Sequence, residues 1–311
     1  MSSISLLIFS YNSADVIENN LKAINLAIRF SKLKDFEILL IDNNSTDDTI
    51  QIANEYAYKN NLKINIQINQ IQGLVFSRIL GIKKASNEWI AFIDDDNFIS
   101  PNWLDELFKI IDDYNPDVIG GSTIAISDVD FPVWFNKNMK TYACGQHYDD
   151  DGFLYNPLES LWGAGLVAKR SLLEEAVTRM DFILTGRIGN KLMAGEDTEL
   201  CYRLRLLGAK FYYSNNLKIN HFMRPKRLVK SQLNKTLEGF GYATVYKEVY
   251  EAILLNKRIG WFFYKIFYSL AAGVFKLIFN FSFSSLKFTF VRLITLNERI
   301  KYYKLVKSTF Q

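Results

Sequence analysis

The first hundred residues alternate short apolar runs with segments whose apolar residues recur at helical spacing, as at Ile17, Leu21, Ile24 and Ile28. The runs expected to form strands are residues 4–10, 36–42, 62–68 and 89–93. Strands that alternate with helices predict a mostly parallel central sheet covered by helices on both faces. With 311 residues and 49% hydrophobic content, the chain can bury such a core.

Polar residues follow three of these runs at the point where each strand should end. Asn12 follows the first, Asp42, Asn43 and Asn44 follow the second, and Asp94, Asp95 and Asp96 follow the fourth. The carboxyl ends of parallel strands share one sheet edge, where open α/β folds bind nucleotides. Neither GxGxxG nor GxxxxGK[ST] occurs, so the pattern argues against dinucleotide and P-loop sites.

Three consecutive carboxylates occur twice in the chain. Asp94–Asp96 follow an apolar strand, where a divalent cation or a network of N–H donors must offset their repulsion. The alternative is a solvated turn that caps the helix expected over residues 100–111. Asp149–Asp151 follow polar residues and precede a glycine, which predicts a solvated loop.

Composition narrows the class of protein. The net charge of +4 comes from 37 basic and 33 acidic residues and gives no argument for a nucleic-acid partner. Cys144 and Cys201 are far apart in the sequence, so we expect neither a disulfide framework nor a zinc site. A reducing compartment is therefore expected. The N-terminal run reads as a strand and not as a signal peptide, which predicts a cytosolic catalytic part.

Several motifs resemble the family 2 glycosyltransferases, bacterial enzymes with the A-type nucleotide-sugar-binding fold, over about residues 4–227. They are "FSYNSADVIENNL", "LLIDNNSTDDT", "SRILGIKKASNEWIAFIDDDN", "GAGLVAKRSLL", "GRIGNKLMAGEDTELCYRLRLLGAKFYY" and "INHFMRPKRL". Their order and spacing make the match specific. The chain departs from the family after Arg78, where Ile79 and Leu80 replace the usual asparagine.

The resemblance implies roles for the residues at the sheet edge. Asp96 would ligate Mn²⁺ or Mg²⁺, Asp94 would reach the ribose or the metal, and Asp42 would contact the base. An ordinary Asp-Asn turn is the alternative for Asp42. The implied donor-binding residues are Ser10, Tyr11, Asn12, Asp42, Asn44, Arg78, Asp94, Asp95, Arg224 and Arg227.

An acidic pair, Glu196 and Asp197, opens an amphipathic helix that carries Leu200 and Leu204 and ends at Gly208. Acidic residues at a helix N-terminus can simply complement its dipole. An inverting sugar transfer needs a general base for the acceptor hydroxyl, and in the family this pair supplies it. The resemblance implies Asp197 as the base and Glu196 as an orienting residue.

His221 and the basic residues after it form the last site motif. The resemblance implies that His221 ligates the metal or approaches the diphosphate, whereas a packed histidine is the alternative. Arg224 and Arg227 fit a loop that pairs with diphosphate oxygens, and a basic patch beside a helix is the alternative.

The segment from residue 258 to 296 is rich in aromatic residues. On one continuous helix, Arg258, Lys265, Lys276 and Lys287 would fall near one line, which predicts an in-plane helix on anionic lipid. A spanning helix would bury Lys276 at a cost of roughly 2.5 to 3.5 kcal/mol. Packing against the catalytic domain is a further alternative, and "FNFSFSSLKFTF" also alternates like a strand.

Together these features predict a catalytic domain over residues 1–227 and a C-terminal helical region over 228–311. The expected activity is an inverting, metal-dependent transfer from a nucleoside-diphosphate sugar, a UDP-sugar foremost, to a hydroxyl of a glycan or lipid-linked acceptor. We expect a cytoplasmic enzyme, peripheral on the inner face of a bacterial membrane, in surface polysaccharide or glycolipid synthesis. An Asp-nucleophile phosphohydrolase and a catalytically silent sugar-nucleotide binding module are the alternatives.

Overall fold

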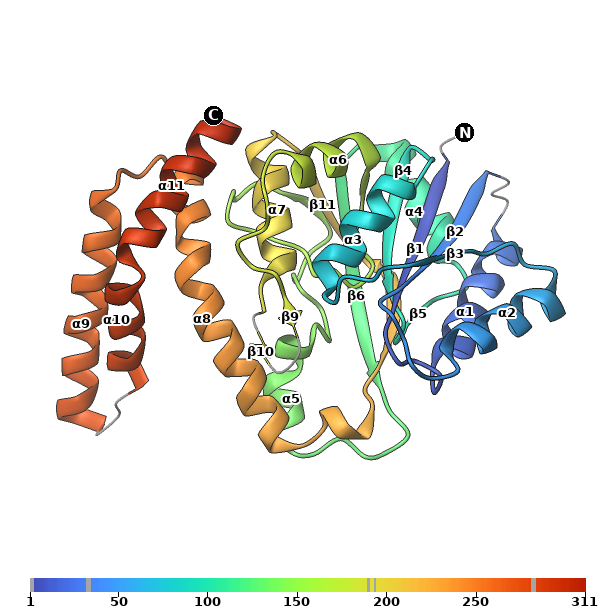
Figure 1. Ribbon diagram of the computed structural model, residues 1–311, viewed down its shortest axis with the longest axis horizontal. Coiled ribbons are helices and arrows are strands. Elements are labelled where there is room, and N and C mark those ends of the chain that lie inside the picture. Colours follow the sequence, from blue (N-terminus) through green and yellow to red (C-terminus); the bar gives the residue numbers. More distant parts are fainter. Residues whose placement is uncertain (1–2, 32–34, 189–190, 193, 281–283) are drawn as a thin grey trace.

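A computed structural model describes residues 3–31, 35–188, 191–192, 194–280 and 284–311. The fold is built on a large mixed sheet (Figure 1). The strand order is β3-β2-β1-β4-β8-β6-β11-β5, and β7 also pairs with β11. These strands are β1 Ile4–Ser10, β2 Phe36–Asp42, β3 Asn65–Ile68, β4 Trp89–Asp94, β5 Asn97–Ile99, β6 Val118–Ile126, β7 Gly152–Leu154, β8 Val167–Lys169 and β11 Phe211–Phe222. The short strands β9 Arg187–Ile188 and β10 Lys191–Leu192 form a separate pair.

The pairing confirms the prediction of a mostly parallel sheet. β1 runs parallel to both β2 and β4, β2 to β3, and β6 to β11. The antiparallel additions are β5, β7 and β8, all of three residues. Such short strands carry too few alternating residues to be distinguished from loops by their sequence pattern.

Helices cover both faces of the sheet, because the strands are apolar on both sides. In β1, Leu6 and Ile8 pack in one buried cluster and Leu7 and Phe9 in the other. The first cluster includes residues of α1 Ile17–Phe30, α2 Thr49–Asn60 and α4 Trp103–Tyr114. The second includes residues of α3 Leu74–Lys84, α6 Arg170–Thr178 and α7 Glu196–Leu206. Short helices follow later strands, namely α5 Phe135–Asn138, η1 Met139–Tyr142 and η2 Pro225–Arg227.

Four further helices stand beside the sheet at the C-terminal end of the chain (Figure 1). They are α8 Lys230–Leu254, α9 Gly260–Asn280, α10 Ser284–Ile294 and α11 Leu296–Phe310. The prediction of one continuous helix with a basic line from Arg258 to Lys287 is therefore wrong. α9 and α10 pack against each other, so the apolar segment folds back and buries part of its own surface. The strand suggested by "FNFSFSSLKFTF" is not present in the described parts of that stretch, which are helical, while residues 281–283 lie outside the described residues.

A buried ion cluster holds the interior of this helical region. Glu248 of α8 accepts hydrogen bonds from Arg292 of α10 and Arg299 of α11, with shortest N···O distances of 2.7 and 2.8 Å. Glu248 and Arg299 are fully buried. Arg292 therefore serves the interior of the region and is not free to meet lipid headgroups.

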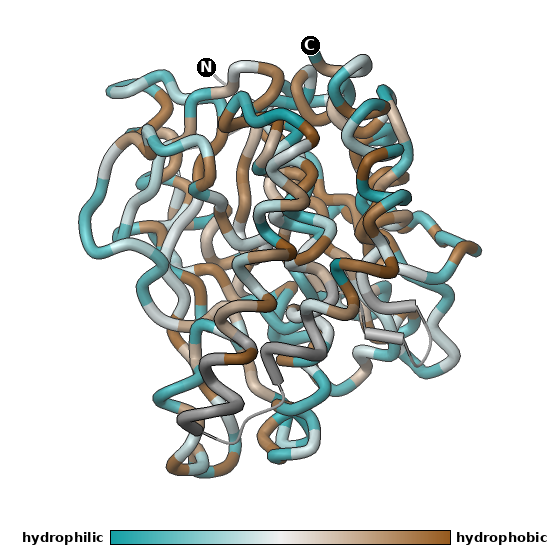
Figure 2. Tube along the Cα trace, turned by 90° about the vertical axis from the view of Figure 1, so that its left-hand side faces the viewer, coloured by the Kyte–Doolittle hydropathy of each residue, from teal (hydrophilic) through white to brown (hydrophobic). Residues whose placement is uncertain are grey.

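The outer side of α9 and α10 presents large apolar side chains to solvent. They are Phe263, Tyr264, Phe267, Tyr268, Leu270 and Val274 on α9, and Phe290, Leu293 and Ile294 on α10. Figure 2 views the molecule from this side. The side chain of Lys265 lies over the Trp261 ring at 4.5 Å, while those of Lys276 and Lys287 lie outside the described residues. Among the helices described, none combines the length and hydropathy needed to cross a bilayer.

A second buried network joins the helical region to α7. Glu199 accepts hydrogen bonds from Arg203 of the same helix and from the Tyr250 hydroxyl of α8, at 2.8 and 2.7 Å. Its carboxylate also receives the backbone N–H groups of Ile183 and Leu184. The helix that begins with Glu196 and Asp197 is thus fixed against α8 three residues further on.

Candidate active site

The carboxylates of the Asp94–Asp96 run lie at the end of β4, at the edge where β1 and β2 also end. Asn20 of α1 fixes this turn, because its Nδ2 donates to the carbonyl oxygens of Asp94 and Asn97 at 3.0 and 2.8 Å. Asn20 and Asn97 are both fully buried. In the sequence, Asn20 is recognisable only as an amide on an otherwise apolar helix face. That pattern does not distinguish a core residue from a site residue.

Asp96 is surrounded by cationic side chains from the end of the chain's last strand and the turn after it. The Arg227 guanidinium lies 2.9 Å from its Oδ2, and Arg224 lies 3.8 Å from the same oxygen. The His221 Nε2 lies 3.4 Å from Asp96 Oδ1. The predicted site residues Asp96, His221, Arg224 and Arg227 therefore meet, although about 125 residues separate Asp96 from His221 in the chain.

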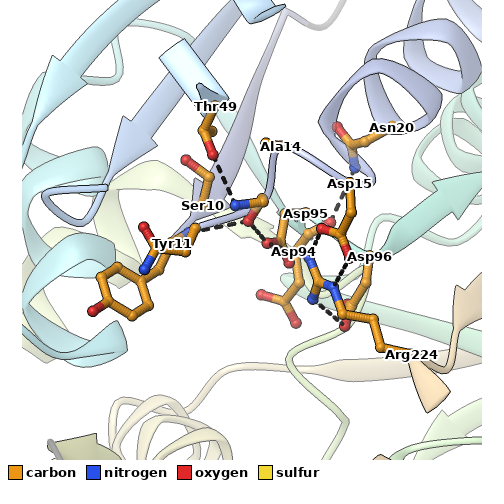
Figure 3. Close-up of polar contacts among 12 residues, drawn as sticks. Ser10, Tyr11, Ala14, Asp15, Asn20, Thr49, Asp94, Asp95, Asp96 and Arg224 are labelled. Atoms are coloured by element: carbon orange, nitrogen blue, oxygen red, sulfur yellow. Dashed lines mark hydrogen bonds and ion pairs between the residues drawn. The ribbon is translucent and has the colours of Figure 1, made fainter. Parts of the chain in front are cut away.

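Asp95 and Arg224 extend this cluster toward the first loop of the fold (Figure 3). Arg224 lies 3.4 Å from Asp95 and makes a two-pronged contact with Asp15, at 2.8 and 3.0 Å. The Ser13 hydroxyl donates to Asp95 Oδ2, the oxygen that Arg224 also contacts. Ser13 and Asp15 were not predicted, because a polar turn before a helix is common outside functional sites.

Burial and charge set the protonation of this cluster. Burial raises the pKa of Asp94 to about 6, and burial together with Asp96 raises the pKa of Asp95. Burial also opposes ionisation of Asp96, but His221 and the two arginines outweigh it and lower the pKa of Asp96. For His221, burial is outweighed by Asp96, which raises the pKa of His221 to about 9. At neutral pH the pair is therefore Asp96 carboxylate and His221 imidazolium.

The Glu196–Asp197 pair approaches the same edge from the other side and meets Arg78. The Arg78 guanidinium, which is buried, donates to Asp197 Oδ1, and the backbone N–H of Gly163 donates to Asp197 Oδ2 at 2.9 Å. Asp94 and Glu196 also contribute to the negative field around Arg78. We expected Arg78 beside the nucleotide, whereas its direct contact here is with Asp197.

Glu196 differs from its neighbour in its surroundings. Its side chain, half-buried, lines a small pocket together with Arg78 and the apolar residues Val75, Ile79, Ile82 and Leu200, and its solvent-inaccessible Oε2 has no hydrogen-bond partner among the described residues. Burial, together with the charge of Asp197, raises the pKa of Glu196 to about 7. Glu196 is thus the carboxyl of the pair that resists ionisation.

The first loop and the end of β2 supply the remaining predicted donor residues. Asp42 is buried and accepts from the hydroxyls of Ser10 and Ser45 at 3.0 and 2.5 Å. Asn12 and Asn44 take left-handed backbone conformations, with φ of 49° and 62°. The loop after β1, which carries Asn12, and the turn after β2, which carries Asn44, therefore meet around Asp42. The Tyr11 side chain projects into solvent beside them (Figure 3).

The segment from Tyr142 to Trp162 borders the site. Cys144 Sγ lies 3.6 Å from His221 Nδ1, and the Trp162 ring stacks on His147 at 4.2 Å. Cys144 and Cys201 are both free, as predicted. The second acidic run, Asp149–Asp151, is exposed as expected, and Asp151 also accepts from Ser214 and Asn215.

The residues around Asp96 fit a divalent cation whose other ligands come from a substrate. Within the described part of the chain, no three His, Cys, Asp or Glu side chains are arranged to enclose a metal by themselves. Mg²⁺ and similar ions commonly use one or two carboxylates together with phosphate oxygens and water. The cations that already contact Asp95 and Asp96 indicate that this position favours positive charge.

The family model described as glycosyl transferase family 2 matches residues 5–177, which hold β1 to β8 and the Asp94–Asp96 run. The chain belongs to this family. It is also similar to the poly(ribitol-phosphate) beta-N-acetylglucosaminyltransferase TarS of Staphylococcus aureus, with 31% identity over 38% of this chain and 20% of TarS. The cholesterol galactosyltransferase of Borreliella burgdorferi is 26% identical over 71% of this chain and 60% of that protein. The chain thus spans less than two thirds of these relatives.

Solved structures agree on the fold. A crystal structure of S. aureus TarS 1–349 in complex with UDP-GlcNAc has a TM-score of 0.51 and 18% identity, over 71% of this chain and 59% of that one. The mannosyltransferase PcManGT from Pyrobaculum calidifontis, in complex with GDP-Man and Mn²⁺, has a TM-score of 0.53 and 14% identity, over 83% and 65%. The α/β sheet predicted from the sequence is therefore the A-type glycosyltransferase fold.

The surroundings of Glu196 predict a pH-dependent stability. A carboxyl whose pKa is raised from 4.5 to about 7 on folding binds its proton more tightly in the folded state, so stability falls as pH rises through this window. Glu196→Gln has no carboxyl proton to lose, so its free energy of unfolding should not fall in this window. Above pH 7 the variant should be more stable than wild type by up to about 3 kcal/mol, and below pH 4.5 the two proteins should be similarly stable. Urea unfolding at pH 4, 6 and 8 measures this, with exposed Glu55→Gln as the control. A pH-independent difference would contradict the assignment.

Proposed function

We propose that this family 2 member catalyses inverting, metal-dependent transfer of a sugar from a nucleoside-diphosphate sugar to an acceptor hydroxyl. The observation that carries the proposal is the meeting of two carboxylate groups at one sheet edge. Asp94–Asp96 lie among cations on one side, and Asp197 lies on the other, with buried Arg78 between them. One group suits the diphosphate side of a donor and the other suits a base.

For the donor, we infer a UDP-sugar bound across the ends of β1, β2 and β4. The inference is supported by the TarS complex with UDP-GlcNAc, whose fold this chain shares. Asp42 and the turn around Asn12 and Asn44 would meet the base, and the exposed Tyr11 ring offers it a stacking surface. Asp94 would reach the ribose, while Ser10 shapes the pocket through its bond to Asp42.

For the diphosphate, Asp96 would hold Mn²⁺ or Mg²⁺, with Asp94 nearby as a further candidate ligand and His221 as another once the ion has displaced its proton. Such an ion, when bound, stabilises the charge that develops on the departing diphosphate. Arg224 contacts Asp95 and Arg227 contacts Asp96. Guanidinium groups pair bidentately with phosphate oxygens, so both arginines suit the diphosphate of a donor.

For the acceptor, Asp197 is the proposed general base. Its two oxygens are oriented by Arg78 and by the N–H of Gly163, beside the Trp162 ring that could border a sugar. A base on the face opposite the leaving diphosphate gives inversion, because the acceptor oxygen attacks from the far side. Glu196 is protonated more readily and packs toward apolar residues, so we assign it a positioning role.

The acceptor is proposed to be a glycan or a lipid-linked sugar at the cytoplasmic face of a bacterial membrane, in surface polysaccharide or glycolipid synthesis. The related cholesterol galactosyltransferase is named for a lipid acceptor. The exposed aromatic side chains of α9 and α10 support peripheral membrane binding, since such residues favour the interface of a bilayer. No nucleic acid is expected as a partner. The domain division at residue 227 is kept as part of this proposal.

The first test concerns the metal. Mn²⁺-dependent hydrolysis of a panel of nucleotide sugars should identify a donor, and Asp96→Ala should weaken Mn²⁺-dependent donor binding at least about tenfold by removing a carboxylate ligand. Asp150→Ala, in the second and exposed acidic run, is the matched control and should bind normally. Calorimetric titration measures both. An equal loss of donor binding in the two variants would refute the distinction between the two acidic runs. Release of inorganic phosphate, with neither sugar transfer nor release of a nucleotide, would favour the phosphohydrolase alternative.

The second test concerns the base. Asp197→Asn keeps the size of the side chain but removes its capacity to accept a proton, so turnover should fall at least about a hundredfold while donor affinity changes little. Steady-state kinetics and donor titration separate these effects. Turnover near that of wild type would move the role to another residue, and no turnover by wild type with any donor would favour a silent binding module.

The third test concerns the membrane. Phe263 and Phe267 of α9 are 54% and 71% exposed. Replacing both with serine should weaken binding to anionic vesicles, measured by co-sedimentation, by about tenfold. Tyr58 on α2 is 90% exposed and far from this surface in sequence, which makes Tyr58→Ser the control. Binding that is insensitive to the phenylalanine changes would contradict insertion of this surface.

A further inference from the structure

An open cleft of about 500 Å³ lies between β6, β11 and the short helix α5, and none of the residues assigned above lines it. We infer that this cleft binds the acceptor glycan at sugars beyond the one that reacts. The inference rests on the proposed function for its role and deepens it by naming a second binding site. The property to be tested is that the cleft binds short saccharides.

An irregularity in β11 borders the cleft. The register of β11 against β6 shifts between Ser214 and Lys218, which leaves Asn215, Asn216 and Leu217 outside the regular ladder. Bulges of this kind are common next to binding sites, because they redirect side chains. Gly121 of β6 permits the close approach of the shifted chain, since a Cβ there would lie 2.0 Å from the Leu217 carbonyl oxygen.

The floor of the cleft is held rigidly. The carbonyl of Asn215 accepts from the Ser122 hydroxyl at 3.0 Å, and its side-chain Oδ1 accepts from the Tyr213 hydroxyl at 2.8 Å. The backbone N–H of Asn215 donates to Asp151 at 2.8 Å. A bulge fixed by three separate hydrogen bonds is preorganised, which lowers the entropic cost of binding.

The lining has the chemistry that saccharides need. Ile124 is 49% exposed, and Phe131, half-buried, stacks on Phe135 at 4.5 Å, so both offer apolar surface to the C–H faces of a sugar. Around them, Asn136, Gln146 and Asn216 are exposed and form no side-chain hydrogen bond within the described structure. Each amide can donate and accept, which matches the hydroxyl groups of a saccharide.

Charge separates a glycan from other occupants. The lining contains one basic residue, Lys218, and no carboxylate. A nucleic acid would require several cations to neutralise its phosphates, and an acyl chain would leave the free amides unpaired. A neutral saccharide, or one with a single acidic substituent, satisfies both the amides and the lysine.

The cleft also stands close to the proposed catalytic centre. Met139 lines it and accepts a hydrogen bond from the backbone N–H of Cys144, whose Sγ lies 3.6 Å from His221 Nδ1. Gly145, next in the chain, bridges to Thr123 of β6 and lines the cleft as well. One layer of chain thus separates the cleft from His221, a position that suits distal sugars of an acceptor.

Saturation-transfer NMR and calorimetry with a panel of di- to tetrasaccharides test the inference. The panel contains neutral hexose, N-acetylhexosamine and uronic-acid oligomers. At least one class should bind wild-type protein at millimolar concentration or better. The double variant Gln146→Ala/Asn216→Ala should weaken that binding about tenfold or more, and Ile124→Trp should block it by filling the cleft. Asn54→Ala, on exposed α2, is the control and should bind as wild type does.

Thermal unfolding of each variant shows whether it is folded before binding is measured. Absence of binding by every panel member, or binding that neither cleft variant changes, would overturn the inference. Metal-dependent donor hydrolysis by wild-type protein is measured in parallel. Hydrolysis without saccharide binding refutes the cleft alone, whereas saccharide binding without hydrolysis of any nucleotide sugar refutes the proposed function and leaves the cleft a saccharide site.

Discussion

The pairing of buried acidic groups with buried cationic groups at one sheet edge is the constraint on which the site depends. Asp94, Asp95 and Asp96 are held where water cannot fully stabilise their charge, and burial raises the pKa of the first two. His221 at the end of β11 and Arg224 and Arg227 just after it reach this edge and keep Asp96 ionised. Removing one partner would leave an uncompensated charge, so the carboxylates at this edge depend on the cationic side chains beside them.

The same constraint links the donor side of the site to the acceptor side. Arg78 is buried between Asp197, Glu196 and Asp94, and its single charge cannot balance three carboxylates. Glu196 responds by holding its proton, whereas Asp197 receives two directed hydrogen bonds. Two adjacent carboxyls thereby acquire different chemical properties from their surroundings.

The helical region at the C-terminal end connects to this site through α7. Glu199 and Arg203 of α7 bond to Tyr250 of α8, and α8 in turn holds α10 and α11 through Glu248. The acidic pair at the start of α7 therefore rests on a frame that includes the exposed aromatic surface of α9 and α10. An enzyme that uses a lipid-linked acceptor would gain from such a connection, because membrane contact and the base would keep a fixed relation.

The sequence by itself determined the local elements and the two acidic motifs. Apolar runs bounded by polar residues gave β1, β2 and β4 correctly, because strand formation there depends on neighbours in the chain. The partner of Arg78, the ion pairs of Asp96, the roles of Ser13 and Asp15, and the hairpin of α9 and α10 were decided only by tertiary structure, although the motifs had already assigned His221, Arg224 and Arg227 to the site. Each depends on which distant side chain arrives at a buried charge or apolar face, and a pattern of near neighbours carries no information about that.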